Sequence, residues 1–310
     1  MRVFVAGHRG TVGSAIVRLA PTNVEVLTRD RATLNLEIRD EVMSYLVDKR
    51  PDAIILAAAK VGGIKANATN QRMHLLQNLR IQNVVIDAAA CLGVPNFLFL
   101  GSSCIYPRVA PQPMRESSLL TGPLEPTNDG YAIAKIAGIR LCRAIFEEEG
   151  LNYFSLMPTN LYGPNDNFNL QTSHVPAALI RKFHEAKLSG ATEVVVWGTG
   201  NPRREFMHVD DMAQACWFML GHDNGGALFN VGTGIDIQIR EFAELVAKVI
   251  GYRGQIVFDT SRPDGPPRKL LDVTKIHSLG WSHGIELEEG LRSTYAWFLK
   301  ALKEGVVRGY

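Results

Sequence analysis

Four residues with reactive side chains lie in two short stretches of the chain. Ser102 and Cys104 follow Phe97-Leu98-Phe99-Leu100, an apolar and aromatic run that predicts a buried strand. Tyr131 and Lys135 are spaced i, i+4, so a helix would place them on one face about one turn apart. A lysine cation lowers the pKa of a neighbouring phenol, and a serine hydroxyl can hold a reacting oxygen. The two stretches therefore predict a proton-transfer centre.

Simpler explanations compete with this interpretation. A tyrosine–lysine pair on an amphipathic helix is usually part of a solvated surface, and a single cysteine such as Cys104 is usually a small buried hydrophobic side chain. His174 could cap a helix or lie on the surface. If Cys104 and His174 faced one pocket, they would form a proton-transfer pair with pKa values near neutrality. Spacing alone leaves both alternatives open.

A glycine turn at the start of the chain predicts a dinucleotide site. Gly7, Gly10 and Gly13 are spaced three apart, between a predicted strand at Arg2–Ala6 and a predicted helix at 14–20. Glycines at these positions permit a tight turn and let backbone N–H groups approach a pyrophosphate. The alternative is a purely structural strand–helix turn. The context of strand, turn and helix favours the dinucleotide.

The residues after the second predicted strand, 24–28, favour NADP(H) over NAD. Arg29 and Arg31 flank Asp30, and Arg9 lies inside the glycine turn. An acidic residue at this position binds the ribose hydroxyls of NAD, whereas arginine forks match the oxygens of a 2′-phosphate. The alternative is a solvated charged loop in which Asp30 contacts the ribose.

Strands and helices alternate through the first half of the chain, which predicts an α/β fold with a doubly wound parallel (Rossmann) sheet. Beyond Pro158 prolines, glycines and asparagines interrupt the pattern, which indicates a second, smaller substrate-binding domain. We expect residues 1–163 to form the NADP-binding domain, with 188–224 returning to it, and 164–187 and 225–310 to form the substrate-binding domain. The other predicted helices are 39–49, 70–92 and 131–149, and the other predicted strands are 53–56, 97–100 and 153–157.

Composition is that of a soluble globular protein. The chain has 310 residues, 46% hydrophobic and 21% charged, with a net charge of +2 that predicts neither nucleic-acid binding nor a membrane surface. No apolar run is long enough to span a membrane. The four cysteines show neither metal-ligand spacing nor a disulfide framework, and a strand at the amino terminus leaves no room for a signal peptide. We therefore expect a cytoplasmic protein without a metal site.

Longer motifs resemble one family over essentially the whole chain. The chain resembles the GDP-L-fucose synthases, which belong to the extended short-chain dehydrogenase/reductase superfamily. The glycine turn and the Tyr131/Lys135 pair are general to the superfamily, whereas the blocks at 57–64, 101–107, 125–128, 157–164, 204–211 and 263–272 are more specific.

The resemblance implies roles for individual residues. It implies that Ser102, Tyr131 and Lys135 form the reductase triad and that Cys104 and His174 perform epimerisations. It implies that Lys182, Trp197, Arg204, Asp264 and Lys269 bind the substrate, Arg204 and Lys269 being suitable partners for its pyrophosphate. It also implies an NADP-binding set: Gly7, His8, Arg9, Gly10, Thr11, Val12, Gly13, Arg29, Arg31, Asn35, Leu36, Leu100, Gly101, Ser102, Ser103, Lys135, Pro158, Thr159, Asn160, Leu161 and His174.

The implied reaction is the NADPH-dependent 3,5-epimerisation and 4-keto reduction of GDP-4-keto-6-deoxy-D-mannose to GDP-L-fucose. An NADP-dependent 4-reductase or epimerase of another nucleotide sugar is the main alternative. A noncatalytic NADP-binding regulator would be expected to lack Tyr131 or Lys135, and both are present. The helices at 70–92 and 129–149 are long enough to pair with copies of themselves, as in this superfamily, so we expect a homodimer with a four-helix interface.

Overall fold

The computed structural model describes residues 1–62, 69–262 and 264–310, and within them a six-stranded parallel sheet forms the larger part of the fold. Its central strands are uniformly apolar because helices cover both faces of the sheet. Phe97, Leu98 and Phe99, for example, are fully buried. In sheet order the strands are β2 (Glu25–Leu27), β1 (Arg2–Ala6), β3 (Ala53–Leu56), β4 (Asn96–Leu100), β5 (Asn152–Pro158) and β9 (Leu228–Val231).

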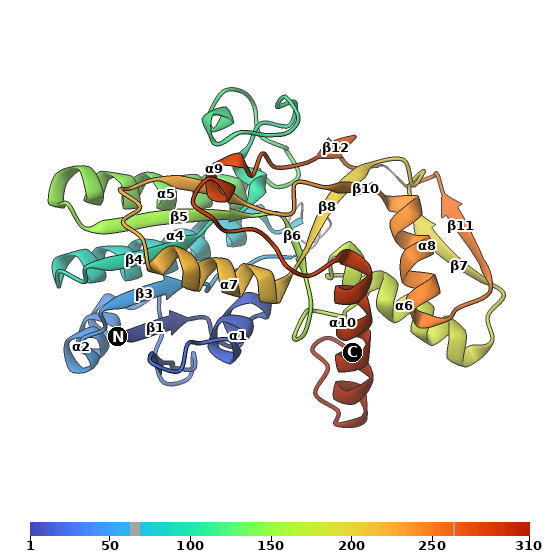
Figure 1. Cartoon of the computed structure of the whole chain (residues 1–310), viewed down its shortest axis with the longest axis horizontal. Coiled ribbons are helices and arrows are strands. Elements are labelled where there is room, and N and C mark those ends of the chain that lie inside the picture. The colour runs from blue at the N-terminus through green and yellow to red at the C-terminus, as the bar shows by residue number, and fades with distance from the viewer. Residues whose placement is uncertain (63–68, 263) are drawn as a thin grey trace.

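Two groups of helices cover this sheet (Figure 1). Helices α2, α4 and α5 pack side by side, and α1 packs against α7. This arrangement is the doubly wound Rossmann architecture, so the predicted fold class is confirmed. The bounds are α1 (Thr11–Arg18), α2 (Arg39–Lys49), α4 (Gln71–Cys91), α5 (Asp129–Glu149) and α7 (Val209–Leu220).

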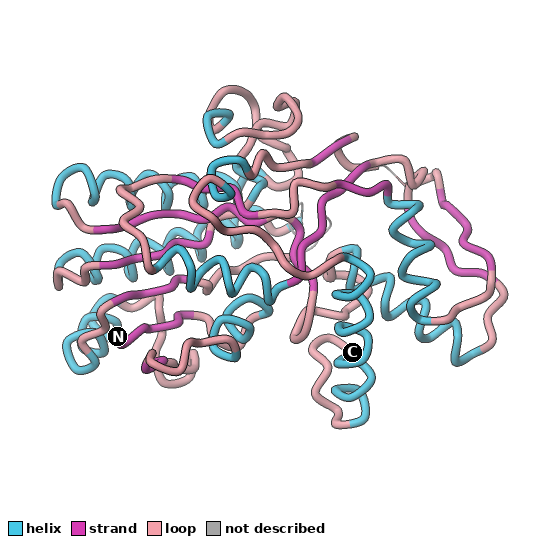
Figure 2. The backbone as a smooth tube through the Cα atoms, viewed as in Figure 1, coloured by secondary structure: helices cyan, strands magenta, loops and turns pink. Residues whose placement is uncertain are grey.

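A smaller part of the fold has its own hydrophobic core and lies beside the sheet's carboxyl edge (Figure 2). Phe183, Phe242 and Phe298 are fully buried in this second core. Strand β8 (Arg203–His208) pairs with β6 (Asn160–Tyr162), β10 (Asp236–Gln238) and β12 (Arg268–Lys269), and β7 (Glu193–Trp197) pairs with β11 (Gln255–Asp259). The helices here are α6 (Val175–Ser189), α8 (Ile239–Ile250) and α10 (Leu287–Lys303).

Strand pairing divides the chain differently from the domain boundaries that the sequence predicts. Within 188–224, α7 packs against α1 of the larger part, but β7 pairs with β11 of the smaller part. Within 225–310, β9 joins the six-stranded sheet beside β5. The reason is that α7 and β9 form one more helix–strand unit, whose Phe229 and Val231 are buried in the larger core.

The predicted elements of the first half agree with the structure to within a few residues. The clearest difference is α1, which begins at Thr11 inside the glycine turn and not at residue 14, because Gly10 already has the extended backbone of an N-cap. Three short helices also lie among the described residues: η1 (Ser103–Ile105), η2 (Glu116–Ser118) and α9 (Thr274–His277). Gly63 and Ile64 of the 57–64 block and Pro263 of the 263–272 block lie outside the described residues.

No helix in the described part of the chain combines the length and apolar character that a membrane span requires.

Candidate functional site

Ser102 and Cys104 lie just beyond the carboxyl end of β4, as the sequence predicts. Ser102 is the N-cap of η1, and its Oγ accepts a hydrogen bond of 3.4 Å from the backbone N–H of Cys104. Cys104 is only 7% exposed and packs in a small cluster with Tyr131 and Ala132 of α5. One cluster therefore joins a residue from each of the two reactive stretches.

Tyr131 and Lys135 lie on the buried face of α5. The ammonium of Lys135 donates a 2.7 Å hydrogen bond to the carbonyl of Leu100 and lies 5.7 Å from the centroid of the Tyr131 ring. Burial lowers the pKa of Lys135 to about 8, and it raises the pKa of Tyr131 above its ordinary value. The Lys135 ammonium therefore lies near both the Tyr131 ring and the end of β4.

Cys104 and His174 are both under the influence of one cation. Burial raises the pKa of the Cys104 thiol, and the charge of Lys269 acts against that rise. Desolvation and the same Lys269 charge lower the pKa of His174, the N-cap of α6. The His174 side chain is exposed to solvent. The charge of Lys269 thus acts on the pKa of both residues.

The glycine turn is shaped for a ligand that approaches the backbone. A Cβ on Gly7, whose φ is +94°, would lie 2.5 Å from the backbone N of Ala58, and one on Gly13 would lie 2.2 Å from the carbonyl oxygen of Gly7. Both positions therefore exclude a side chain. A Cβ on Gly10 would meet only the Gly7 carbonyl, at 3.4 Å, so the space over the start of α1 is open. The first N–H groups of α1 face that space, and they suit a pyrophosphate.

The charged residues beside this turn already have partners. Asp30 accepts contacts from Arg9 at 2.7 Å and from His8 at 3.1 Å. Arg31 pairs with Glu37 at 3.1 Å, whereas Arg29 lies 5.4 Å from the ring centroid of Tyr45. Arg9 and Arg31, whose guanidiniums could bind a 2′-phosphate, are thus paired with Asp30 and Glu37.

The other residues predicted for the cofactor lie along the same edge of the sheet. Asn35 caps the turn that follows, its side-chain oxygen accepting from the N–H of Glu37 at 3.1 Å, and Leu36 packs on the large core. Thr159 and Asn160 connect β5 to β6 and donate side-chain hydrogen bonds to the carbonyl of Glu205. The remaining members of the set begin α1 (Thr11, Val12), end β4 or β5 (Leu100, Pro158), follow β4 (Gly101, Ser103) or lie in β6 (Leu161).

The residues predicted for the substrate lie on the smaller part of the fold. The ammonium of Lys182 lies 5.6 Å from the ring centroid of Trp197, which is 55% exposed at the end of β7. Asp264 accepts hydrogen bonds from the N–H and hydroxyl of Thr199, at 2.9 and 2.7 Å. Arg204 on β8 stands opposite Lys269 on β12 in the strand register. The smaller part of the fold thus carries the aromatic and cationic side chains that the resemblance assigns to the substrate.

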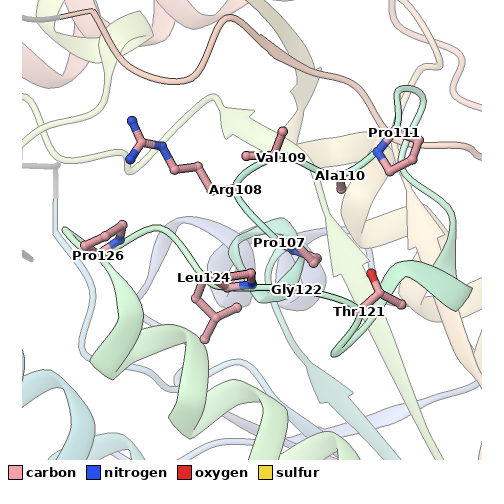
Figure 3. Close-up of a pocket in the computed structure, with 10 residues that line it drawn as sticks. Pro107, Arg108, Val109, Ala110, Pro111, Thr121, Gly122, Leu124 and Pro126 are labelled. Atoms are coloured by element: carbon pink, nitrogen blue, oxygen red, sulfur yellow. The ribbon is translucent and has the colours of Figure 1, made fainter.

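One cavity lies apart from these residues. It has a volume of about 400 Å³ and is lined by the loop at 107–126, including Arg108, Val109 and Leu124 (Figure 3). Leu124 also packs against the cluster of Cys104, Tyr131 and Ala132. None of the predicted catalytic residues lines it. Among the described residues, no group of three histidine, cysteine or acidic side chains is placed to hold a metal ion.

Sequence reasoning did not identify Glu205 as an organising residue. Its carboxylate is completely buried and accepts backbone N–H groups from Thr233 at 2.7 Å, Gly234 at 2.8 Å and Leu271 at 3.0 Å. Glu205 thereby ties the loop after β9 to β12. No strand is predicted at 203–208 from the sequence, so no local signal marked Glu205, whose carboxylate is buried with partners once β8 forms.

The comparisons with known proteins agree with this geometry. A model of the NAD dependent epimerase/dehydratase family matches residues 3–232. The GDP-L-fucose synthase of Escherichia coli (strain K12) is 54% identical over 316 residues, covering 96% of this chain and 97% of that protein. The probable GDP-L-fucose synthase 1 of Oryza sativa subsp. japonica is 54% identical over 304 residues, covering 96% of this chain and 92% of that protein.

A solved structure is similar over nearly the full length. A GDP-L-fucose synthetase from Naegleria fowleri bound to NADP superposes with a TM-score of 0.89 at 27% identity, covering 97% of this chain and 93% of that chain. Both the sequence relatives and this structure extend beyond the 3–232 match into the smaller part of the fold. The chain therefore belongs to the NAD dependent epimerase/dehydratase family and, within it, to the GDP-L-fucose synthases.

Proposed function

We propose that this chain converts GDP-4-keto-6-deoxy-D-mannose to GDP-L-fucose by 3,5-epimerisation followed by NADPH-dependent reduction at C4. The observation that carries the proposal is the cluster of Cys104 with Tyr131 at the end of β4, one helical turn from Lys135. A thiol in contact with a reductase tyrosine supplies a base for ring inversion beside the groups for reduction. One bound sugar could then undergo both reactions.

The epimerisation uses the acidity that the C4 ketone gives to C3 and C5. Cys104 as thiolate removes a proton, and the electron pair of the broken C–H bond moves towards O4. The hydroxyls of Ser102 and Tyr131 donate hydrogen bonds to that oxygen and stabilise its charge. His174 as imidazolium returns a proton to the opposite face of the carbon, and proton exchange with solvent restores both groups.

The reduction uses the same hydroxyls. NADPH supplies the hydride for C4 when it is bound along the glycine turn. Tyr131 then donates its proton to the new alkoxide oxygen. Lys135, hydrogen-bonded to the Leu100 carbonyl, stabilises the tyrosinate by its charge.

The charge on Lys135 predicts the pH dependence of the reduction. Because the pKa of Lys135 is lowered to about 8, its cationic form is lost as the pH rises through that value. We expect the single-turnover rate of NADPH oxidation to be about tenfold lower at pH 9 than at pH 7. The Lys135→Arg variant stays cationic across this range, so its rate should be lower but flat. A wild-type rate that does not fall above pH 8 would contradict this role of Lys135.

Cofactor preference is predicted to depend on Arg31. Removing its guanidinium in Arg31→Ala takes away a charge-assisted contact to the 2′-phosphate, so the Kd for NADPH should rise by about 10-fold to 100-fold. The Kd for NADH, which lacks that phosphate, should change less than twofold. Arg29→Ala is a comparison variant, since Arg29 stacks towards Tyr45. Equal losses for NADH and NADPH in Arg31→Ala would contradict the assignment.

The decisive test of the function supplies GDP-4-keto-6-deoxy-D-mannose and NADPH to the purified protein. The loss of absorbance at the NADPH band and the identity of the product by NMR should show GDP-L-fucose. Oxidation of NADPH without inversion at C3 and C5 would favour a simple 4-reductase. Oxidation only with another nucleotide sugar would favour the alternative substrate.

We also propose a homodimer in which α4 and α5 of two copies form a four-helix interface. Both helices have 21 residues, and Met73, Leu76 and Ile133 on them are exposed apolar side chains, at 41%, 40% and 44%. Burial of such side chains favours association. Light scattering after gel filtration should give twice the chain mass of 34.2 kDa, and a monomeric mass would count against the interface.

A reducing compartment suits the four cysteines, all of which are free thiols. Cys104 must stay reduced to act as a base. We therefore place the enzyme in the cytoplasm, where thiols persist.

A further inference from the structure

The loop at 163–174 joins β6 to α6 and runs between the two parts of the fold. It leaves β6 where α7 of the larger part and β8 of the smaller part both pack (Figure 1). It ends at His174, the N-cap of α6. Residues 158–161, which the sequence assigns to the cofactor, come shortly before it. The loop therefore continues the chain from one predicted part of the cofactor site.

Asn165 fastens this loop to the first turn of α1 by two hydrogen bonds. Its backbone carbonyl accepts from the hydroxyl of Thr11 at 3.2 Å, and its side-chain amide donates to Oγ of Ser14 at 3.1 Å. Its φ of +62° lies in the left-handed region, which asparagine adopts more readily than most residues. We call Thr11, Ser14 and Asn165 the clasp. One residue of the loop thus holds both ends of the first helical turn.

The turn that the clasp holds is the one suited to the cofactor phosphates. The N–H of Ser14 donates to the carbonyl of Gly10 at 2.9 Å, and the N–H groups of residues 11–13 precede this bond. Such N–H groups at the start of a helix suit a pyrophosphate. The clasp joins the loop to Thr11, the residue that supplies the first of them. Residues 163–167 therefore lie at the border of the pyrophosphate site.

The middle of the loop is anchored separately, in the smaller part of the fold. Phe168 is completely buried, and its ring centroid lies 4.7 Å from that of Phe298. Its N–H donates to the carbonyl of Arg308 at 2.9 Å, and its carbonyl accepts from Arg181 at 3.1 Å. Breaking the clasp would therefore release the loop from α1 and leave its attachment to the smaller part intact.

We propose that Asn165 is a positioning residue that holds the loop against the pyrophosphate site and so slows the release of NADP(H). A dinucleotide bound at the first turn of α1 leaves when the loop moves away, and that motion breaks the clasp. The proposal goes beyond the proposed reaction, because it concerns how long the cofactor stays bound. Its test needs no nucleotide sugar, so it can fail while the proposed reaction stands.

The test measures cofactor release from the full-length protein. Stopped-flow fluorescence follows the release of NADPH and of NADH after mixing with excess NADP⁺, and competition gives the Kd for adenosine 2′-phosphate, which has no pyrophosphate. Asn165→Gly keeps the carbonyl and permits the left-handed backbone, and Ser14→Ala breaks the same bond from the helix side. The control is Asn167→Gly, since that side chain bonds to Thr172 and to the N–H of Asn169 within the loop.

We expect Asn165→Gly and Ser14→Ala each to release NADPH and NADH about threefold to tenfold faster than the wild type, the effect of one lost hydrogen bond. The double variant should be no faster than either single variant, because both remove the same bond. The Kd for adenosine 2′-phosphate should stay within about twofold of the wild type, as should NADPH release from Asn167→Gly.

Asn165→Asp separates an effect on binding from an effect on stability. The Ser14 hydroxyl already donates to the carbonyl of Thr11 at 3.1 Å, so a carboxylate at residue 165 would lose the hydrogen bond to it. A negative charge beside the start of α1 favours the helix, which offsets that loss, but it repels a pyrophosphate. We expect an unchanged or higher urea midpoint together with a Kd for NADPH raised by about tenfold.

Three results would overturn the proposal. Wild-type release rates in both Asn165→Gly and Ser14→Ala would show that the clasp does not retain the cofactor. Equal weakening of adenosine 2′-phosphate would indicate damage to the whole cofactor site, and equally fast release from Asn167→Gly would indicate general disorder of the loop. If Asn165→Gly does not fold by circular dichroism, Ser14→Ala, which places a strong helix former in α1, is judged by the same criteria.

Discussion

Cys104→Ser is expected to abolish deuterium uptake at C3 and C5 from heavy water while leaving NADPH binding within twofold of the wild type. A serine hydroxyl is far less acidic than a thiol, so the base is lost although the side chain keeps its size and place in η1. General-base catalysis contributes about 10²-fold to 10⁴-fold, and we expect exchange to fall by about 10³-fold. NMR of the recovered sugar measures the exchange, and fluorescence titration measures NADPH binding.

The matched control is Cys91→Ser on α4, an exposed cysteine outside the site. It should leave exchange and turnover unchanged. Normal exchange in Cys104→Ser would remove the cysteine from the mechanism, since no other thiol shares its cluster with Tyr131 in the part of the chain that the structure describes. Equal loss of NADPH binding would instead indicate a damaged fold.

Local patterns predicted the larger part of the fold well. The apolar runs that become β1, β3, β4 and β5 are buried on both faces, so their composition alone marks them as central parallel strands. The i, i+4 spacing of Tyr131 and Lys135 placed both on the buried face of α5, next to the strand end that carries Ser102. Each of these features depends on residues that are close in sequence, so the local sequence pattern was enough to predict it.

Features that depend on distant segments were not predictable in this way. Strand β9 lies beside β5 because α7 carries the chain back over the sheet, and its short sequence gives no sign of its partner. Arg204 and Lys269 lie next to each other because β12 pairs with β8, and only the completed fold brings these strands together. Motif resemblance assigned both residues to the substrate, but no local pattern predicts that they are neighbours.

Glu205 joins these distant segments, and its replacement should have the largest effect on stability. In Glu205→Leu, the backbone N–H groups of Thr233, Gly234 and Leu271 lose their acceptor inside the protein. Each buried N–H left without a partner costs about 1–3 kcal/mol, so a loss of at least about 3 kcal/mol is expected. The change also removes the cost of burying a carboxylate, which is seen in its raised pKa. The loss of the acceptor for three buried N–H groups costs more than removing that carboxylate gains.

Packing adds to the loss. A Cβ on Gly232 would lie 2.1 Å from Oε1 of Glu205, so the flat carboxylate fills a space that the branched end of leucine does not fit. Urea denaturation followed by circular dichroism measures the free energy of unfolding. Glu193→Leu, at an exposed position on β7, is the control and should change it by less than about 0.5 kcal/mol.

Glu205→Gln tests the hydrogen bond to Leu271 apart from those to Thr233 and Gly234. The amide oxygen can still accept from Thr233 and Gly234, which share Oε1, but the NH₂ group then faces the N–H of Leu271. We expect a smaller loss of about 1–3 kcal/mol, confined to the hydrogen bond that anchors β12. Urea denaturation measures this loss as for Glu205→Leu. A Glu205→Gln protein with wild-type stability would show that β12 is held without this carboxylate.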